Sequence, residues 1–82
     1  MTPEIATYQG EQAVRAYAVR RREDFTFWRD YNRSKMNAES TPPHARAAAS
    51  EEARVYSEAI RALDEVVRLL DATRSDRMEA AA

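Results

Sequence analysis

Residues 37–43 read Asn-Ala-Glu-Ser-Thr-Pro-Pro, which is the only clear break in an otherwise helix-favouring chain. Pro42 disfavours helical geometry at Thr41, and neither proline has an N–H group to donate to a continuing helix. Both prolines are tolerated in the first turn of a new helix, so Ser40 or Thr41 is expected to cap it. The sequence therefore predicts two helices separated by a short turn.

Before the break, the chain is predicted to form one long helix. Thr2 can act as its N-cap, Pro3 suits the first helical position, and Glu4 complements the helix dipole. Gly10 in a helix interior costs about 1 kcal/mol relative to Ala. The alternation around Thr26 is one that a short strand would tolerate. A break at Gly10 or near Phe25 is therefore left open.

Beyond the break, the apolar residues predict the second helix. Six of them fall at a and d positions of a heptad and three more widen the same face: Ala49, Tyr56, Ala59, Leu63, Val66 and Leu70, then Ala53, Ile60 and Val67. The opposite face alternates in charge, which predicts a solvated surface: Arg54, Glu58, Arg61, Asp64, Arg68 and Asp71. The predicted boundaries are a helix over 3–38, a turn over 39–42, a helix over 43–74 and a frayed tail over 75–82.

Two long helices joined by a short turn predict an all-α fold, an antiparallel two-helix hairpin that forms a single domain over residues 1–82. A chain of 82 residues buries only about 60% of its unfolded surface, and the absence of cysteine excludes disulfides. The first helix also carries two apolar stripes, and one neighbouring helix covers only one of them. We therefore expect self-association, as a homodimer, into a four-helix bundle.

The two stripes of the first helix are expected to have different neighbours. One stripe should face the second helix, and it holds Ala6, Ala13, Val14, Tyr17, Ala18, Phe25, Trp28 and Tyr31. The other should face a different molecule, and it holds Ile5, Tyr8, Ala16, Val19 and Phe27.

Composition excludes several classes of function. The net charge is -1, from 13 basic and 14 acidic residues, so no global field recruits nucleic acid or an anionic membrane. The only histidine, His44, has no companion at metal-binding spacing, so no metal or cofactor is expected. No nucleophile–base grouping or phosphate-binding loop occurs, so we expect no enzyme. No signal-like segment or membrane-length apolar run is present, which predicts a cytoplasmic location.

The stretch Val19–Arg33 is the expected binding surface. It holds both phenylalanines, the only tryptophan and five of the twelve arginines, and Trp and Arg are typical anchors of protein interfaces. We expect a small regulatory, adaptor or inhibitory protein, from a bacterium or phage, that binds another protein through a helix face. The expected binding residues are Val19, Arg21, Asp24, Phe27, Trp28 and Tyr31.

A second hypothesis is a small nucleic-acid-binding protein, in which basic side chains contact phosphates and aromatic rings stack on bases. Its residues would be Arg20, Arg21, Arg22, Arg29, Arg33 and Lys35. Glu23, Asp24 and Asp30 lie among these residues and cancel much of their field, so protein binding is the preferred interpretation.

Overall fold

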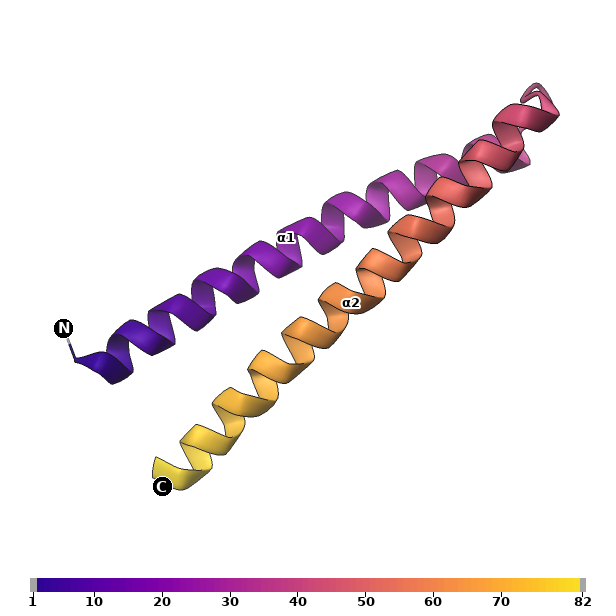
Figure 1. Cartoon of the computed structure of the whole chain (residues 1–82). Helices are drawn as coiled ribbons and strands as arrows, with labels where there is room; N and C mark the ends of the chain where they lie inside the picture. Colours follow the sequence, from indigo (N-terminus) through magenta and orange to yellow (C-terminus); the bar gives the residue numbers. More distant parts are fainter. Residues whose placement is uncertain (1, 82) are drawn as a thin grey trace.

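The computed structural model describes residues 2–81, with side chains described for residues 2–78. Two α-helices, α1 (Pro3–Asn37) and α2 (Pro43–Ala81), run antiparallel and are joined by residues 38–42 (Figure 1). The predicted all-α antiparallel hairpin is confirmed. Its extents are 58 × 22 × 13 Å between Cα atoms, so it is a long, thin layer of two helices.

The start of α1 follows from its capping residues. Thr2 has extended backbone geometry, and its Oγ1 accepts a hydrogen bond from the Ile5 N–H at 3.4 Å. Pro3 occupies the first turn, where its missing N–H has no helical partner to lose. The helix then runs without interruption to Asn37, so neither Gly10 nor the segment around Phe25 breaks it.

The turn is held by one arginine that the sequence patterns do not single out. Arg46, in the first turn of α2, donates from Nε to the Thr41 carbonyl at 2.9 Å. Its Nη2 donates to the carbonyls of Ala38 and Glu39 at 3.0 and 3.2 Å. Carbonyl groups just beyond a helix end lack helical partners, so Arg46 satisfies them and ties the two helices together.

The second helix is longer than expected. It continues to Ala81, whereas the sequence predicts an end at residue 74 and a frayed tail. Residues 75–81 contain neither glycine nor proline, and Arg77 forms an ion pair with Glu11 of α1. Helix propensity and this contact extend the helix. Residue 82, the last of the expected tail, lies outside the described residues.

The helices meet along one stripe of each, which we call the contact stripes. Their members recur alternately at four and three positions, as in a coiled coil, and all are buried or half-buried. In α1 they are Glu11, Arg15, Ala18, Arg22, Phe25, Arg29, Asn32 and Met36. In α2 they are Ala49, Ala53, Tyr56, Ile60, Leu63, Val67 and Leu70.

This register differs from the prediction for α2. The sequence assigned Ala59 and Val66 to heptad core positions and gave Val67 a supporting place, but Val67 is 8% exposed and Val66 is 38% exposed. Both alternatives share Tyr56, Leu63 and Leu70, so the apolar pattern alone does not separate them. The helix is rotated so that Ile60 and Val67, in place of Ala59 and Val66, lie in the contact with α1.

The prediction for α1 is wrong in a similar way. Of the eight residues expected to face α2, only Ala18 and Phe25 belong to its contact stripe, while Tyr17, Trp28 and Tyr31 are exposed. Phe25 packs against Tyr56 with ring centroids 5.6 Å apart. Arg15 and Arg22, also in the contact stripe of α1, pair with α2, whereas most of the large apolar residues of α1 lie outside this stripe.

The buried set between the helices is small. Among residues 2–78 it consists of Ala18, Ala49, Ala53, Val67 and one polar residue, Asn32. The Asn32 side chain donates from Nδ2 to the Trp28 carbonyl at 2.8 Å. Hydrophobic stabilisation scales with the apolar area buried, so a core made mostly of alanine contributes little.

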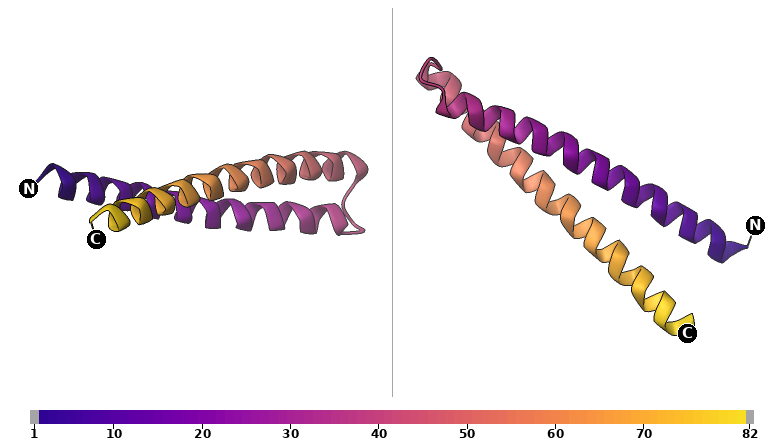
Figure 2. Two further views of the ribbon diagram at one scale, coloured as in Figure 1. Left: turned by 90° about the horizontal axis from the view of Figure 1, so that it is seen from below. Right: turned by 180° about the vertical axis from the view of Figure 1, so that it is seen from behind.

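The hairpin opens away from its turn. The helices lie close together near the turn and separate toward the two termini, and a view from below shows α2 crossing over α1 (Figures 1 and 2). Small residues line the close end, where Ala49 and Ala53 are buried. Arginine–carboxylate pairs span the open end, where the backbones are farther apart.

Candidate interaction face

The two wide faces of the hairpin are defined by the residues that flank the contact stripes. An antiparallel pair of helices has an approximate twofold axis perpendicular to its wide face, and rotation about this axis exchanges the two helices. Residues that immediately precede a contact position therefore lie on the same wide face in both helices. One face therefore carries Arg21 and Trp28 of α1 together with Ala59 and Val66 of α2. Each of these residues immediately precedes a contact position.

On this face, α1 presents a stripe that is mostly aromatic and apolar. Its members recur alternately at three and four positions, and all are exposed. They are Val14, Tyr17, Arg21, Asp24, Trp28 and Tyr31. We call this set the exposed stripe of α1, and it contains four of the six residues that the sequence assigns to partner binding.

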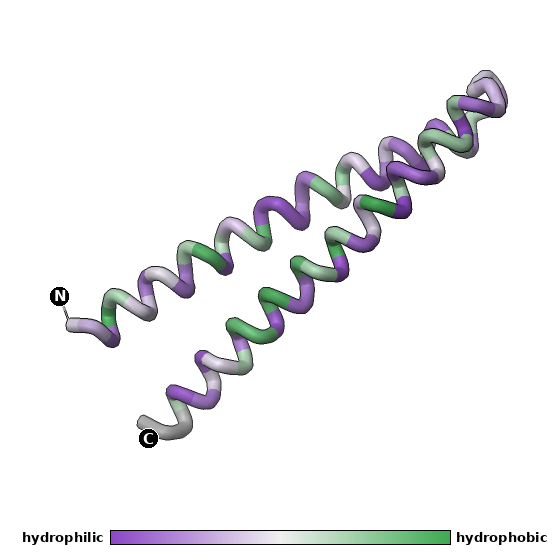
Figure 3. The backbone as a smooth tube through the Cα atoms, in the orientation of Figure 1, coloured by the Kyte–Doolittle hydropathy of each residue, from purple (hydrophilic) through white to green (hydrophobic). Residues whose placement is uncertain are grey.

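The second helix presents an apolar stripe on the same face, which we call the exposed stripe of α2. It consists of Val55, Ala59, Ala62, Val66 and Leu69. Ala59 is half-buried and the others are exposed, Leu69 to 58%. This stripe is not among the sequence predictions, although its spacing of four and three residues can be recognised without a structure. Apolar segments recur along both helices and are densest midway along α2 (Figure 3).

The two exposed stripes together form what we call the apolar face, and the opposite wide face differs from it. Helical geometry places mostly charged and polar residues there: Gln9, Gln12, Ala16, Val19, Glu23, Thr26, Asp30, Arg33, Ala47, Ser50, Arg54, Ser57, Arg61, Asp64, Arg68 and Asp71. The hairpin as a whole is therefore amphipathic. An exposed apolar face rimmed by polar residues is typical of a protein interface.

One charged pair lies in the middle of the exposed stripe of α1. Arg21 Nη1 and Asp24 Oδ2 are 3.9 Å apart, and both side chains are about half exposed. The Arg21 guanidinium also lies over the rings of Phe25 and Tyr17, at 5.0 and 6.0 Å from their centroids. The aromatic rings hold this arginine in place, while the long distance to Asp24 leaves both groups able to accept another partner.

Three aromatic residues form an exposed cluster in α1. Trp28 makes edge-to-face contacts with Phe27 at 5.2 Å and with Tyr31 at 5.7 Å. Trp28 is 45% exposed and Phe27 is 62% exposed, so the expectation that Trp28 faces α2 is wrong. Phe27 lies on the outer edge of α1, opposite its contact stripe. Val19 is half-buried on the other wide face, apart from this cluster.

Two aspartates expected on the solvated surface of α2 are about half exposed and also reach α1. Asp71 accepts from Nε and Nη2 of Arg15 at 2.8 and 3.2 Å, and Asp64 accepts from Nη1 of Arg22 at 2.8 Å. The hydrogen bond from Arg15 lowers the pKa of the Asp71 carboxyl. In the same way, the hydrogen bond from Arg77 lowers the pKa of Glu11.

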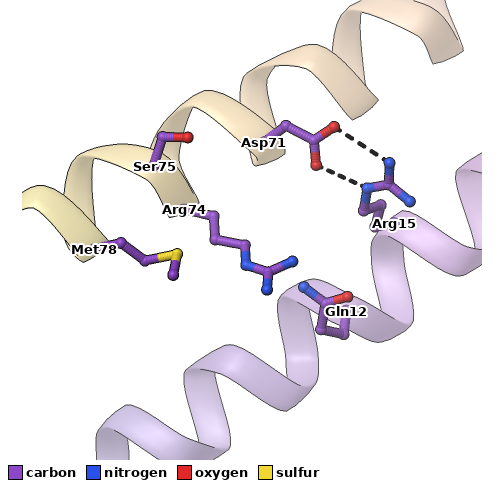
Figure 4. A pocket seen from close by; sticks show the side chains of 6 residues that line it. All are labelled: Gln12, Arg15, Asp71, Arg74, Ser75 and Met78. Atoms are coloured by element: carbon purple, nitrogen blue, oxygen red, sulfur yellow. Dashed lines mark hydrogen bonds and ion pairs between the residues drawn. The ribbon is translucent and has the colours of Figure 1, made fainter.

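A polar groove lies between the helices at their open end. It is lined by Gln12, Arg15, Asp71, Arg74, Ser75 and Met78. Figure 4 shows the double contact between Arg15 and Asp71, with the Arg74 side chain extending toward α1. The Arg74 guanidinium lies 5.5 Å from the Tyr8 ring centroid. The groove is thus spanned by interactions between α1 and α2.

The residues of the nucleic-acid hypothesis do not form one basic patch. Arg21 pairs with Asp24, Arg22 with Asp64, and Arg29 with Asp30. Lys35 lies over the Tyr31 ring at 5.6 Å. Arg20 and Arg33 are exposed. These pairings lower the positive field of the segment, which weakens the case for phosphate binding.

Within residues 2–78 no group of histidine and acidic side chains is arranged to hold a metal ion. Neither helix, over the part that the structure describes, is long and apolar enough to cross a membrane. Comparisons with protein-family models, curated proteins and solved structures find no match to this chain.

Proposed function

We propose that this chain is a small, non-enzymatic protein-binding hairpin that self-associates into a four-helix bundle through its apolar face. The observation that carries the proposal is the contrast between the two wide faces. Over residues 2–78 this two-helix layer encloses almost no large side chain, since the buried apolar residues there are Ala18, Ala49, Ala53 and Val67. Covering the apolar face would supply the hydrophobic burial that the hairpin lacks.

Two matched alanine substitutions test self-association. Ala62 and Ala47 are both exposed positions of α2, one on the apolar face and one on the opposite face. We expect Ala62→Glu to convert the dimer into a monomer, because it buries an unpaired charge, and Ala47→Glu to leave the dimer intact. Sedimentation equilibrium from low to high micromolar concentration measures this. An unmodified chain that stays monomeric and fully folded would end the proposal.

The role of this dimer is to bind another protein, in a regulatory, adaptor or inhibitory capacity. Phe27 supports this part of the proposal, because it is highly exposed at the outer edge of α1 and is held by Trp28. An aromatic side chain fixed in an exposed place is a typical interface anchor. Phe27→Ala is expected to preserve the dimer and to abolish capture of a partner protein from the native host. Equal capture by both forms would reject this role for Phe27.

A further inference from the structure

We propose that the second copy of the chain docks on the apolar face with its turn at the opposite end. In this arrangement α1 lies on the second copy's α1, and α2 lies on the second copy's α2. The twofold axis of this dimer lies between the two copies. It passes α1 at the level between Arg21 and Asp24, and it passes α2 at the level between Ala59 and Ala62. This inference rests on the proposed self-association and adds the orientation of the partner.

The order of residues in the exposed stripe of α1 carries the first part of the argument. A twofold axis at the midpoint between Arg21 and Asp24 places Arg21 against the second copy's Asp24, and Asp24 against its Arg21. The same axis places Tyr17 against Trp28 and the apolar Val14 against Tyr31. The stripe is therefore complementary to itself when it is reversed, in charge as well as in apolar character.

The exposed stripe of α2 has the same property. Val55, Ala59, Ala62 and Val66 read the same in both directions about the midpoint between the two alanines. Reversal places alanine against alanine near the axis, which lets the two α2 helices approach closely, and valine against valine on either side. Small residues opposite one another give contact without overpacking.

The two midpoints also lie at the same height along the hairpin. Arg22, beside the midpoint of α1, donates to Asp64 at 2.8 Å, and Asp64 lies within one helical turn of Ala62. A single twofold axis in the plane of the interface has to cross both helices at one level. If the two stripes were self-complementary by chance, their midpoints would not be expected to lie at the same level along the hairpin.

The competing arrangement places the two turns at the same end, so that α1 lies on the second copy's α2. It would cover Arg21 and Asp24 with Ala59 and Ala62, which removes water from a loose ion pair and offers no polar partner. Both arrangements bury the apolar face, and the exposed pair that the competing one would add between Lys35 and Glu52 near the turn contributes little. The charges in the centre therefore favour turns at opposite ends.

The apolar face lies in the middle of the hairpin. Its stripes span residues 14–31 of α1 and 55–69 of α2, roughly 20–25 Å at about 1.5 Å per residue, and the rest of the 58 Å length is left for polar contacts at the rim of the interface. A second copy aligned with the hairpin covers the whole length of both exposed stripes.

The distance between the two turns tests the orientation directly. The chain has no cysteine, so Glu39→Cys in the turn provides a single site for a nitroxide spin label. Turns at opposite ends predict a label separation of about 50 Å, because Glu39 lies about 16 residues from the axis at about 1.5 Å per residue. Turns at the same end predict one on the order of 10–20 Å, which is the spacing of packed helices with the label linkers added. Pulsed dipolar spectroscopy separates these values. A short distance overturns the orientation but leaves self-association standing, whereas a monomer overturns both.

Mixing two charge variants tests the reciprocal contact. Arg21→Asp makes the centre of the face negative, and Asp24→Arg makes it positive. Each variant alone is expected to dimerise about tenfold more weakly, while the mixture forms heterodimers well above their statistical share. Native mass spectrometry counts the species, and far-UV circular dichroism confirms that both variants remain helical. A statistical mixture would contradict the contact between Arg21 and the second copy's Asp24.

Discussion

At the scale of the residue, alanine decides where the helices meet. Ala18 and Ala49 are 1% and 2% exposed, which means that the backbones approach closely beside both residues and leave no room for a larger side chain. The sequence emphasises the aromatic residues of α1, yet only Phe25 among its large aromatics lies in the contact stripe. Close approach of small residues sets the contact, and the large residues remain available outside it.

The tightness of this contact predicts the effect of enlarging one alanine. Ala49→Leu is expected to destabilise the hairpin by about 2 kcal/mol, because extra methylene groups in a packed contact force the helices apart. Ala47→Leu makes the same change at an exposed position of the same helix and should alter stability by only a few tenths of a kcal/mol. Urea denaturation of both variants provides the measurement. Equal losses would contradict the contact stripe of α2.

At the scale of the element, α1 tolerates a glycine in its interior. A Cβ atom added at Gly10 would meet nothing within 4 Å, and Gly10 does not have a positive φ angle. Gly10→Ala is therefore expected to stabilise the chain by about 0.5–1 kcal/mol, because alanine loses less backbone entropy on helix formation. Thermal unfolding followed by circular dichroism would show a higher midpoint. A lower midpoint would mean that this end of α1 is not helical in solution.

The pairing between elements at the open end predicts a dependence on pH. Hydrogen bonds from Arg77 and Arg15 lower the pKa values of Glu11 and Asp71 below their ordinary values. Carboxyl groups with lowered pKa values stabilise the fold above their unfolded pKa of about 4, and this stabilisation is lost as the pH falls through the lower folded values. The urea midpoint should therefore fall on acidification below about pH 5.

The double variant Glu11→Gln, Asp71→Asn removes both groups and should show a weaker acid dependence than the parent chain. Glu58→Gln provides the control, because Glu58 pairs with Arg54 inside α2 and spans no gap between the helices. An unchanged acid dependence in the double variant would show that these pairs do not hold the open end.

Comparison of sequence and structure separates local signals from tertiary ones. The prolines at the turn predict the hairpin, because their effect on the backbone is local. The register of α2 is not predictable in this way, since Ala59 and Val66 fit the heptad as well as Ile60 and Val67 do. The observed register of α2 is accompanied by ion pairs between α1 and α2. The spacing of residues within one helix does not predict such pairs.

The same distinction applies to the candidate site. Trp28 and Tyr31 were predicted as binding residues from their type, and they do lie on the apolar face. Val19 was included because of an assumed second stripe, and the rotation of α1 places it on the other wide face. The contribution of α2, in Val55 and Leu69, was missed because the helix was assigned a single apolar face.

At the scale of the whole molecule, Trp28 reports on assembly because it is the only tryptophan. It is 45% exposed in the single hairpin, so its emission maximum should move to shorter wavelength as concentration rises and the apolar face is covered. The thermal midpoint should rise with concentration over the same range, since association favours the folded state by mass action. Ala62→Glu should abolish both changes. Concentration-independent emission and melting would indicate a hairpin that works alone.

The open end of the hairpin also governs how the fold responds to force. Residues at the start of α1 and the end of α2 lie at the same end of the molecule, and Arg46 closes the other (Figure 1). A force that pulls the start of α1 away from the end of α2 would separate the interhelical pairs one after another, beginning with Glu11 and Arg77. It would not shear all of these pairs at once. Little force is needed to unzip such a geometry, so a single hairpin is a poor tether. A protein fused to either terminus would lie at the open end and would leave the turn exposed at the other end of the hairpin.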